Sequence, residues 1–127
     1  MMNINEIGTI IVDAAITVHR LLGPGLLESC YETCLMYELT TRGLFVERQK
    51  SIPIIYGLIK LESGYKIDLL VEKQIVIELK SVETLKDIHT AQILTYMKLG
   101  SYRLGYLMNF NERLMKNGIK RYILTIE

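Results

Sequence analysis

The stretch IDLLVEKQIVIELK, residues 67–80, contains two apolar runs, and each run carries an acidic residue in its interior. Runs of Ile, Leu and Val of this length are typical of strands that are covered on both faces of a sheet. An ionised carboxylate in such a strand is costly to bury unless it is paired or binds a metal. The fold and the chemistry therefore both depend on how Asp68 and Glu78 are placed.

The turn between the two strands decides whether these acids meet. A three-residue loop at 72–74 places Asp68 directly opposite Glu78, because alternate residues of a strand share a face. A two-residue loop at 72–73 places Asp68 opposite Ile77 instead. Three-residue hairpin loops are common, but they usually contain a glycine, which this loop lacks. The sequence favours the first register without excluding the second.

Under the first register two carboxylates face each other, which destabilises a sheet by about 0.2–1 kcal/mol. A divalent cation such as Mg²⁺ or Mn²⁺, which binds carboxylate and carbonyl oxygens, reverses the sign of that interaction. Lys80 shares the face of Glu78 and would then lie near a metal-bound water or a phosphate oxygen. The alternative is a cross-strand ion network in which Asp68 and Glu78 pair with Lys66 and Lys80. Spacing alone does not separate these two interpretations.

The rest of the chain predicts a single domain over residues 1–127. Helical periodicity predicts three helices, at 3–22, 26–42 and 84–99. Asn3 is the expected cap of the first helix, and Thr84 and Asp87 approximate a capping box at the start of the third. Strand patterns occur at 44–48, 52–56, 65–71, 75–80, 102–110 and 122–126. This order predicts an α/β fold in three layers, α/β/α, with the sheet between helices.

Composition and charge narrow the class of protein. The net charge of +1 is not that of a protein that coats nucleic acid non-specifically. The longest apolar run, residues 7–18, is too short and too polar to span a bilayer, and the opening MMNINEIG lacks the basic region of a secretion signal. Cys30 and Cys34 have no further ligands at metal-binding spacing, so we interpret them as two buried, reduced thiols. We expect a cytoplasmic protein with no membrane partner.

Three further side chains are candidates for a site. Glu28 lies in the first turn of the second predicted helix, where the helix dipole alone also favours a carboxylate. Gln92 and Tyr96 are four residues apart on the third predicted helix, on a face with apolar neighbours, and polar groups buried there need partners. We interpret His19 as a partner of the helix dipole and His89 as a surface residue rather than as metal ligands.

The order of these residues resembles a known family. Asp68 followed by E-L-K at 78–80, on adjacent strands, resembles the PD-(D/E)XK nuclease superfamily. The motif G-x-x-E-x-x-Y at 25–31 resembles the GxxExxY proteins, a group placed within that superfamily. The resemblance runs from about residue 19 to residue 121 and includes Q-x-x-x-Y at 92–96 and the late NF and GIKR segments. The residue before Asp68 is isoleucine where the motif has proline, but the acid is retained.

The resemblance implies a restriction-endonuclease-like core, a central mixed sheet flanked by helices, and Mg²⁺-dependent cleavage of a phosphodiester bond, with Mn²⁺ as a substitute. Carried over by position, Asp68, Glu78 and the Leu79 carbonyl would hold the metal, and Lys80 would orient or activate the attacking water. The other catalytic residues implied in this way are Glu28, Gln92 and Tyr96.

Our first hypothesis is therefore a metal-dependent nuclease acting on DNA, with RNA as an alternative substrate. The second is a nucleic-acid-binding or regulatory module that keeps the fold but does not cut, which the near-neutral charge and small size favour. A third, purely structural interpretation treats the acids as ion pairs. We favour the first because all the expected site residues are retained. A homodimer, which would supply two sites for two strands, is a separate hypothesis.

Overall fold

The computed structural model describes residues 2–62 and 64–125, and its centre is a five-stranded sheet. In spatial order the strands are β1 (Val46–Ser51), β4 (Lys66–Val71), β5 (Ile75–Lys80), β6 (Leu104–Asn109) and β7 (Ile119–Ile123). β5 and β6 run parallel because a helix connects them, and every other neighbouring pair is antiparallel. The sheet is therefore mixed, as the sequence resemblance implied.

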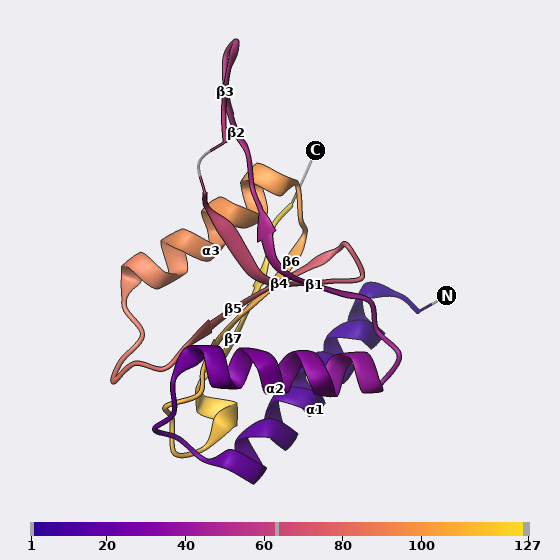
Figure 1. Cartoon of the computed structure of the whole chain (residues 1–127), viewed down its shortest axis with the longest axis vertical. Coiled ribbons are helices and arrows are strands. Elements are labelled where there is room, and N and C mark those ends of the chain that lie inside the picture. The colour runs from indigo at the N-terminus through magenta and orange to yellow at the C-terminus, as the bar shows by residue number, and fades with distance from the viewer. Residues whose placement is uncertain (1, 63, 126–127) are drawn as a thin grey trace.

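Helices cover both faces of this sheet (Figure 1). The helices are α1 (Ile4–Leu22), α2 (Glu28–Thr41), α3 (Asp87–Gly100) and a short 3-10 helix, η1 (Met115–Asn117). The larger apolar cluster lies between the sheet and α1 and α2, and it includes the fully buried Ile11 and Ile77. A smaller cluster lies under α3, where Ile93 packs with Val76. The predicted three-layer α/β/α class is confirmed.

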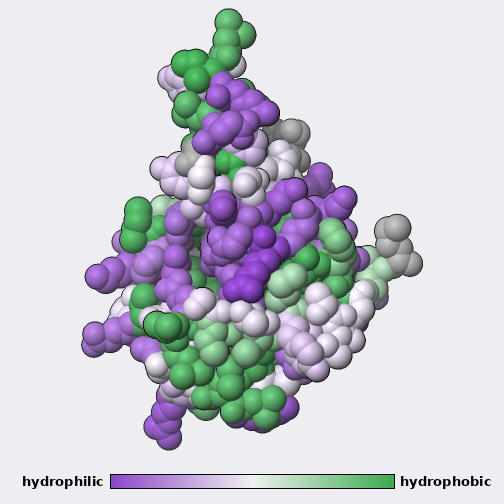
Figure 2. Space-filling model, viewed as in Figure 1, coloured by the Kyte–Doolittle hydropathy of each residue, from purple (hydrophilic) through white to green (hydrophobic). Residues whose placement is uncertain are grey.

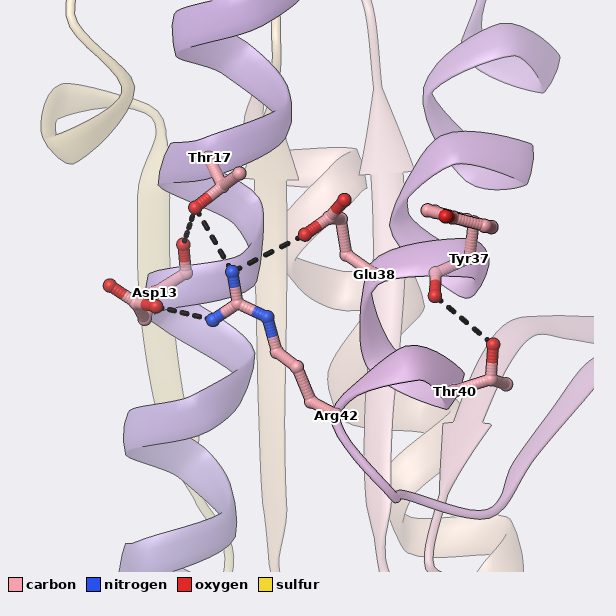
Figure 3. Close-up of polar contacts among 6 residues, drawn as sticks. All are labelled: Asp13, Thr17, Tyr37, Glu38, Thr40 and Arg42. Carbon is pink, nitrogen blue, oxygen red and sulfur yellow. Dashed lines mark hydrogen bonds and ion pairs between the residues drawn. The ribbon is translucent and has the colours of Figure 1, made fainter.

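Arg42 ties α2 to α1 (Figure 3). Its guanidinium donates to the Asp13 carboxylate and to Thr17 Oγ1 at 3.1 Å, both on α1, and to Glu38 Oε1 at 3.3 Å on α2. The hydrogen bond that Arg42 donates to Asp13 is the main cause that raises the pKa of Arg42. The network fixes how α2 lies against α1, and α2 carries one of the acids described below.

The strand expected at 52–56 belongs to a second, two-stranded sheet. β2 (Ile54–Tyr56) pairs with β3 (Ile59–Leu61) through a turn at Gly57, whose φ of 60° is left-handed. The hairpin projects from the end of the main sheet, and its tip is hydrophobic and exposed (Figures 1 and 2). Leu58 at the tip is fully exposed. The predicted strand is therefore present over 54–56, and the prediction missed the second short strand, β3, that follows Gly57.

β1 forms one outer edge of the main sheet and is interrupted at Gln49. Arg48 pairs with Leu69 and Lys50 pairs with Ile67, but Gln49 has no such partner and has a left-handed φ of 53°. The register is the same on both sides of Gln49, so no residue is inserted, and the left-handed conformation distorts the strand at this one position. The interruption directs Gln49 toward the site described below.

Some predicted boundaries are wrong. α3 begins at Asp87 rather than at residue 84, because the Lys86 N–H donates to His89 Nδ1 at 3.0 Å and the histidine supplies the cap expected from Thr84. The last strand is β7, at 119–123 rather than 122–126, and residue 126 lies outside the described residues. The Asn3 cap of α1 is confirmed, since Asn3 Oδ1 accepts the Glu6 N–H at 2.9 Å.

Two burial predictions also fail. The helical periodicity at 26–42 also predicts that Leu27 faces the core, but Leu27 is 77% exposed because α2 begins at Glu28 and Leu27 is its extended N-cap residue. Cys30 is exposed and Cys34 half-buried, and both are free thiols. No helix in the described part of the chain combines the length and apolar character required to cross a bilayer.

Candidate metal-dependent active site

The β4–β5 hairpin has the three-residue loop that brings the acids together. Val71 pairs with Ile75, which leaves residues 72–74 as the loop. Glu72 and Lys73 take left-handed φ values of 52° and 57°, so they supply the conformation for which glycine is usual. The favoured register is therefore confirmed, and the glycine that the pattern lacked is not required.

The two strands separate immediately beyond the Leu69–Ile77 pair, which is where the acids lie. Asp68 Oδ2 accepts the Leu79 N–H at 2.9 Å, so a side chain takes the place of a backbone partner. Asp68 also lies close enough to the Glu78 carboxyl to raise its pKa. The two acids lie on the same side of the sheet, as the register predicted.

Glu78 is a buried carboxyl group with an unusual charge state. It is 3% exposed, and its Oε1 atom has no hydrogen-bond partner. Burial first, and then the hydrogen bond with Asp68 and the negative charge of Asp68, raise the pKa of Glu78 to about 10. Without a cation, Glu78 therefore holds a proton at neutral pH.

The donor set fits a hard divalent cation. Among the described residues neither Asp68 nor Glu78 forms an ion pair with a lysine, so the cross-strand network expected as the alternative is not formed. No group of three or more His, Cys, Asp or Glu side chains is arranged for a metal in the described ranges. Two carboxylates and a main-chain carbonyl still suffice for Mg²⁺, which keeps several waters. The unsatisfied Glu78 Oε1 is the kind of buried atom that a cation satisfies.

Lys80 is held by a short polar chain that leads to α3. Its Nζ donates to Gln92 Oε1 at 3.1 Å, and Gln92 Nε2 donates to the Tyr96 hydroxyl at 3.1 Å. Tyr96 is 7% exposed, and burial is the main cause that raises its pKa. The structure therefore brings together the acids of β4 and β5, the ammonium group of β5 and the Gln-Tyr pair of α3.

Glu32 and Gln49 join the site although the sequence reasoning missed both. Gln49 Nε2 donates to Glu32 Oε1 at 2.7 Å and to Asp68 Oδ1 at 3.3 Å, and Arg48 Nε donates to Glu32 Oε2 at 2.6 Å. Glu32 is 7% exposed, which is rare for an acid unless it is paired. Its helical spacing from Leu35 and Leu39 was the available signal, because these three residues share the buried face of α2.

Glu28 lies one turn before Glu32 and is exposed at the start of α2. The motif tyrosine has a clear structural role. The Tyr31 hydroxyl donates to the Gly23 carbonyl at 2.6 Å and accepts the Leu26 N–H at 3.0 Å, which closes the loop between α1 and α2. Ser81, directly after β5, donates to the Leu26 carbonyl at 2.6 Å. The loop before Glu28 is therefore anchored to the end of the strand that carries Glu78.

The late NF and GIKR segments frame the same end of the sheet. The buried Asn109 donates to the Val82 carbonyl at 2.9 Å and accepts its N–H at 3.1 Å, which holds the chain after β5. Phe110 stacks on Tyr31 with ring centroids 4.6 Å apart. Gly118 has no room for a side chain, because an added Cβ would lie 2.2 Å from the Asn109 carbonyl oxygen.

A pocket of about 550 Å³ opens beside this site, and Lys80, Gln92 and Tyr96 form part of its lining. Pockets of this size typically hold small organic ligands or parts of larger ones. The site is thus accessible from the α3 side of the sheet.

Comparison with known proteins agrees with this arrangement. The family model of the PD-(D/E)XK nuclease superfamily matches residues 5–122. Searches of curated proteins and of solved structures give no match. The match extends over both outer layers and the whole sheet, and it includes the strands that carry Asp68 and Glu78. The chain belongs to the PD-(D/E)XK nuclease superfamily.

Proposed function

We propose that this protein is a divalent-metal-dependent nuclease that hydrolyses phosphodiester bonds, with DNA as the first substrate to test and RNA as the second. The observation that carries the proposal is the Asp68–Glu78 pair, in which the strand register brings two acids together and one buried oxygen of Glu78 has no hydrogen-bond partner. A structural ion pair would satisfy that oxygen, whereas a metal site leaves it available in the absence of the ion.

The proposed ligands of Mg²⁺, or of Mn²⁺ as its substitute, are the Asp68 and Glu78 carboxylates and the Leu79 carbonyl. A bound cation at this position supplies an acidified water and charge stabilisation at the phosphate. For the cation to bind, Glu78 must release the proton that its surroundings otherwise retain. The site therefore exchanges a proton for a metal.

Lys80 provides the positive group of the site. We assign to its ammonium group the orientation of the attacking water and the stabilisation of charge on the phosphate. Gln92 accepts a hydrogen bond from that ammonium group and donates one to the Tyr96 hydroxyl, so this pair positions Lys80. For the early-helix acid we prefer Glu32, which is linked to Asp68 through Gln49, and we retain Glu28 as the alternative.

The test is cleavage of labelled DNA and RNA by the purified protein in Mg²⁺, in Mn²⁺ and in EDTA. We expect cleavage only with metal, and its loss in Asp68→Ala and in Lys80→Ala. Arg113→Ala, an exposed basic residue away from the site, is the control for contamination and for general loss of charge. Intact substrate with folded wild-type protein in every metal would contradict the nuclease proposal. If nucleic acid were still bound, that result would favour the non-catalytic binding or regulatory module.

Three finer assignments accompany this proposal. The G-x-x-E-x-x-Y motif at 25–31 supports membership of the GxxExxY group. A homodimer would present one site to each strand of a duplex. Sedimentation at micromolar protein concentration tests this hypothesis, and a monomer at that concentration would contradict it. A cytoplasmic location is retained as a prediction, which fractionation of the source cells would test.

A further inference from the structure

The pocket beside Lys80 has a composition that phosphate binding does not explain. Apolar side chains from two elements line it: Ile54 at the base of the β2–β3 hairpin, and Ile88 and Leu99 on α3. Ile88 is 69% and Leu99 39% exposed, so neither is packed within the chain as a core residue is. Exposed apolar side chains gathered around one concave site are typical of ligand binding.

Two tyrosines contribute the aromatic surface of this pocket. The Tyr65 and Tyr96 rings lie 6.5 Å apart between centroids and are tilted by 51°. Tyr96 is nearly buried and hydrogen-bonded to Gln92, whereas Tyr65 is 52% exposed. The Tyr65 backbone is fixed, because its carbonyl accepts the Ile52 N–H at 2.9 Å. The pocket thus has one buried, hydrogen-bonded ring, that of Tyr96, and one half-exposed ring, that of Tyr65.

Charge is confined to one end of the pocket. Of the residues that line it, Lys80 is the only lysine or arginine, and it lies at the end shared with the acids. A phosphate can therefore be neutralised by a lysine at that end, whereas the rest of the lining consists of apolar and aromatic side chains together with His89, Gln92 and Thr95. The part of a substrate that extends from the scissile phosphate into the pocket must be flat and nearly uncharged.

We propose that this pocket binds one unpaired nucleobase next to the scissile phosphate, so that the substrate is single-stranded nucleic acid or a duplex with an unpaired end. The inference rests on the proposed nuclease function and deepens it. Bases stack on aromatic side chains regardless of sequence, which suits a pocket with few polar groups to read base edges. A base within a blunt duplex cannot enter unless it is flipped out of the stack.

Binding is measured by fluorescence anisotropy of labelled oligonucleotides. The protein used is the cleavage-deficient variant Asp68→Asn, to which the pocket substitutions below are added. The probes are a single-stranded DNA, the same sequence as a blunt duplex, the duplex with an unpaired overhang, and the single-stranded RNA. We expect the single strand and the overhang to bind at least tenfold more tightly than the blunt duplex. Comparing the single-stranded RNA with the single-stranded DNA shows which nucleic acid supplies the unpaired base.

Variants of the pocket then identify the binding surface. Removing a stacking ring with Tyr65→Ala should weaken single-strand binding about tenfold. Tyr65→Phe, which keeps the ring, should restore it, and Thr95→Trp, which fills the pocket from its rim, should weaken it without removing any aromatic group. Tyr37→Ala, an exposed tyrosine on the outer face of α2, is the matched control and should have no effect.

The outcomes separate this inference from the proposed function. Equal or tighter binding of the blunt duplex, no effect of Tyr65→Ala and Thr95→Trp, or no binding of any probe overturns the pocket assignment. Cleavage of blunt duplex by wild-type protein, unaffected by Tyr65→Ala, leaves the nuclease proposal standing and overturns the pocket. A Tyr65-dependent preference for single strands without cleavage under any metal supports the pocket and overturns the nuclease.

Discussion

Glu32 on α2 and Asp68 on β4 accept hydrogen bonds from the same nitrogen, Gln49 Nε2, at 2.7 Å and 3.3 Å. One amide group therefore links an acid of the outer helical layer to an acid of the central sheet. Arg48 donates to the other oxygen of Glu32, so the helix acid is held from two sides. Glu32 is linked to the proposed metal site by this shared donor.

The first prediction concerns which early-helix acid serves the site. Glu32→Gln should reduce the cleavage rate about tenfold to hundredfold, because groups that orient metal ligands have effects of that size. Glu28→Gln should leave the rate within about twofold, since Glu28 is exposed. Single-turnover cleavage with saturating metal is the measurement. A larger loss in Glu28→Gln than in Glu32→Gln would return the catalytic role to Glu28.

The second prediction concerns the chain from Lys80 to Tyr96. Lys80→Ala should lower kcat about 10²–10³-fold, the usual effect of removing a group that stabilises transition-state charge. Gln92→Ala should lower kcat less, with KM nearly unchanged, because the ammonium group remains but loses its positioning partner. Lys120→Ala, an exposed lysine on β7, is the control. If Gln92→Ala instead raised KM by as large a factor as it lowered kcat, Gln92 would be a substrate-binding residue.

The third prediction concerns pH and follows from Glu78. In EDTA the folded protein keeps the Glu78 proton up to a pKa of about 10, whereas the unfolded chain releases it near the ordinary value of 4.5. Folding therefore takes up a proton between these values, and the free energy of unfolding should fall as pH rises through this window. Urea unfolding at a series of pH values measures it. Glu78→Gln should flatten the dependence, and an unchanged slope would remove Glu78 as its cause.

The fourth prediction concerns metal and stability. Mn²⁺ at a concentration one hundred times its Kd should raise the free energy of unfolding by about 2.7 kcal/mol, if it binds only the folded chain. At a fixed Mn²⁺ concentration, the increase in the free energy of unfolding should be larger at higher pH, because fewer protons then compete with the cation for Glu78. Thermal unfolding in EDTA and in Mn²⁺ measures the shift. Asp68→Asn should abolish it, and a shift that persisted in this variant would locate the bound ion elsewhere.

The fifth prediction separates the structural from the catalytic part of the G-x-x-E-x-x-Y motif. Tyr31→Phe keeps the stacking on Phe110 but leaves the Gly23 carbonyl and the Leu26 N–H without their partner. We expect a loss of about 1–3 kcal/mol of stability. The matched control is Tyr37→Phe, on the exposed side of α2. Lost cleavage with unchanged stability would contradict the structural role.

Local sequence patterns predicted the elements that carry strong periodicity. The residues of β5 were expected with their observed bounds, and the Asp68–Glu78 register followed from counting along two strands. The order of helices and strands likewise gave the α/β/α class, since it reflects which faces must be buried. These features depend on residues that are close together in the chain.

The features that sequence reasoning missed depend on contacts between distant segments. Gln49 reaches Asp68 because β1 pairs with β4 and Gln49 takes a left-handed conformation there, and no local pattern marks either feature. Glu32 is buried because Arg48 and Gln49 reach it from another element, whereas the motif drew attention to Glu28. The cap of α3 was assigned to Thr84 because histidine is not a usual capping residue.

The left-handed residue in β1, Gln49, has a consequence beyond the proposed site. An outer strand with regular, unpaired backbone groups is a template on which another chain can add, and such growth leads to aggregation. Here the left-handed residue breaks that template near its middle, and Glu47 and Lys50 place charges beside it. The same distortion that lets the Gln49 amide donate to Glu32 and Asp68 therefore also makes this edge strand a poor template for the addition of another strand.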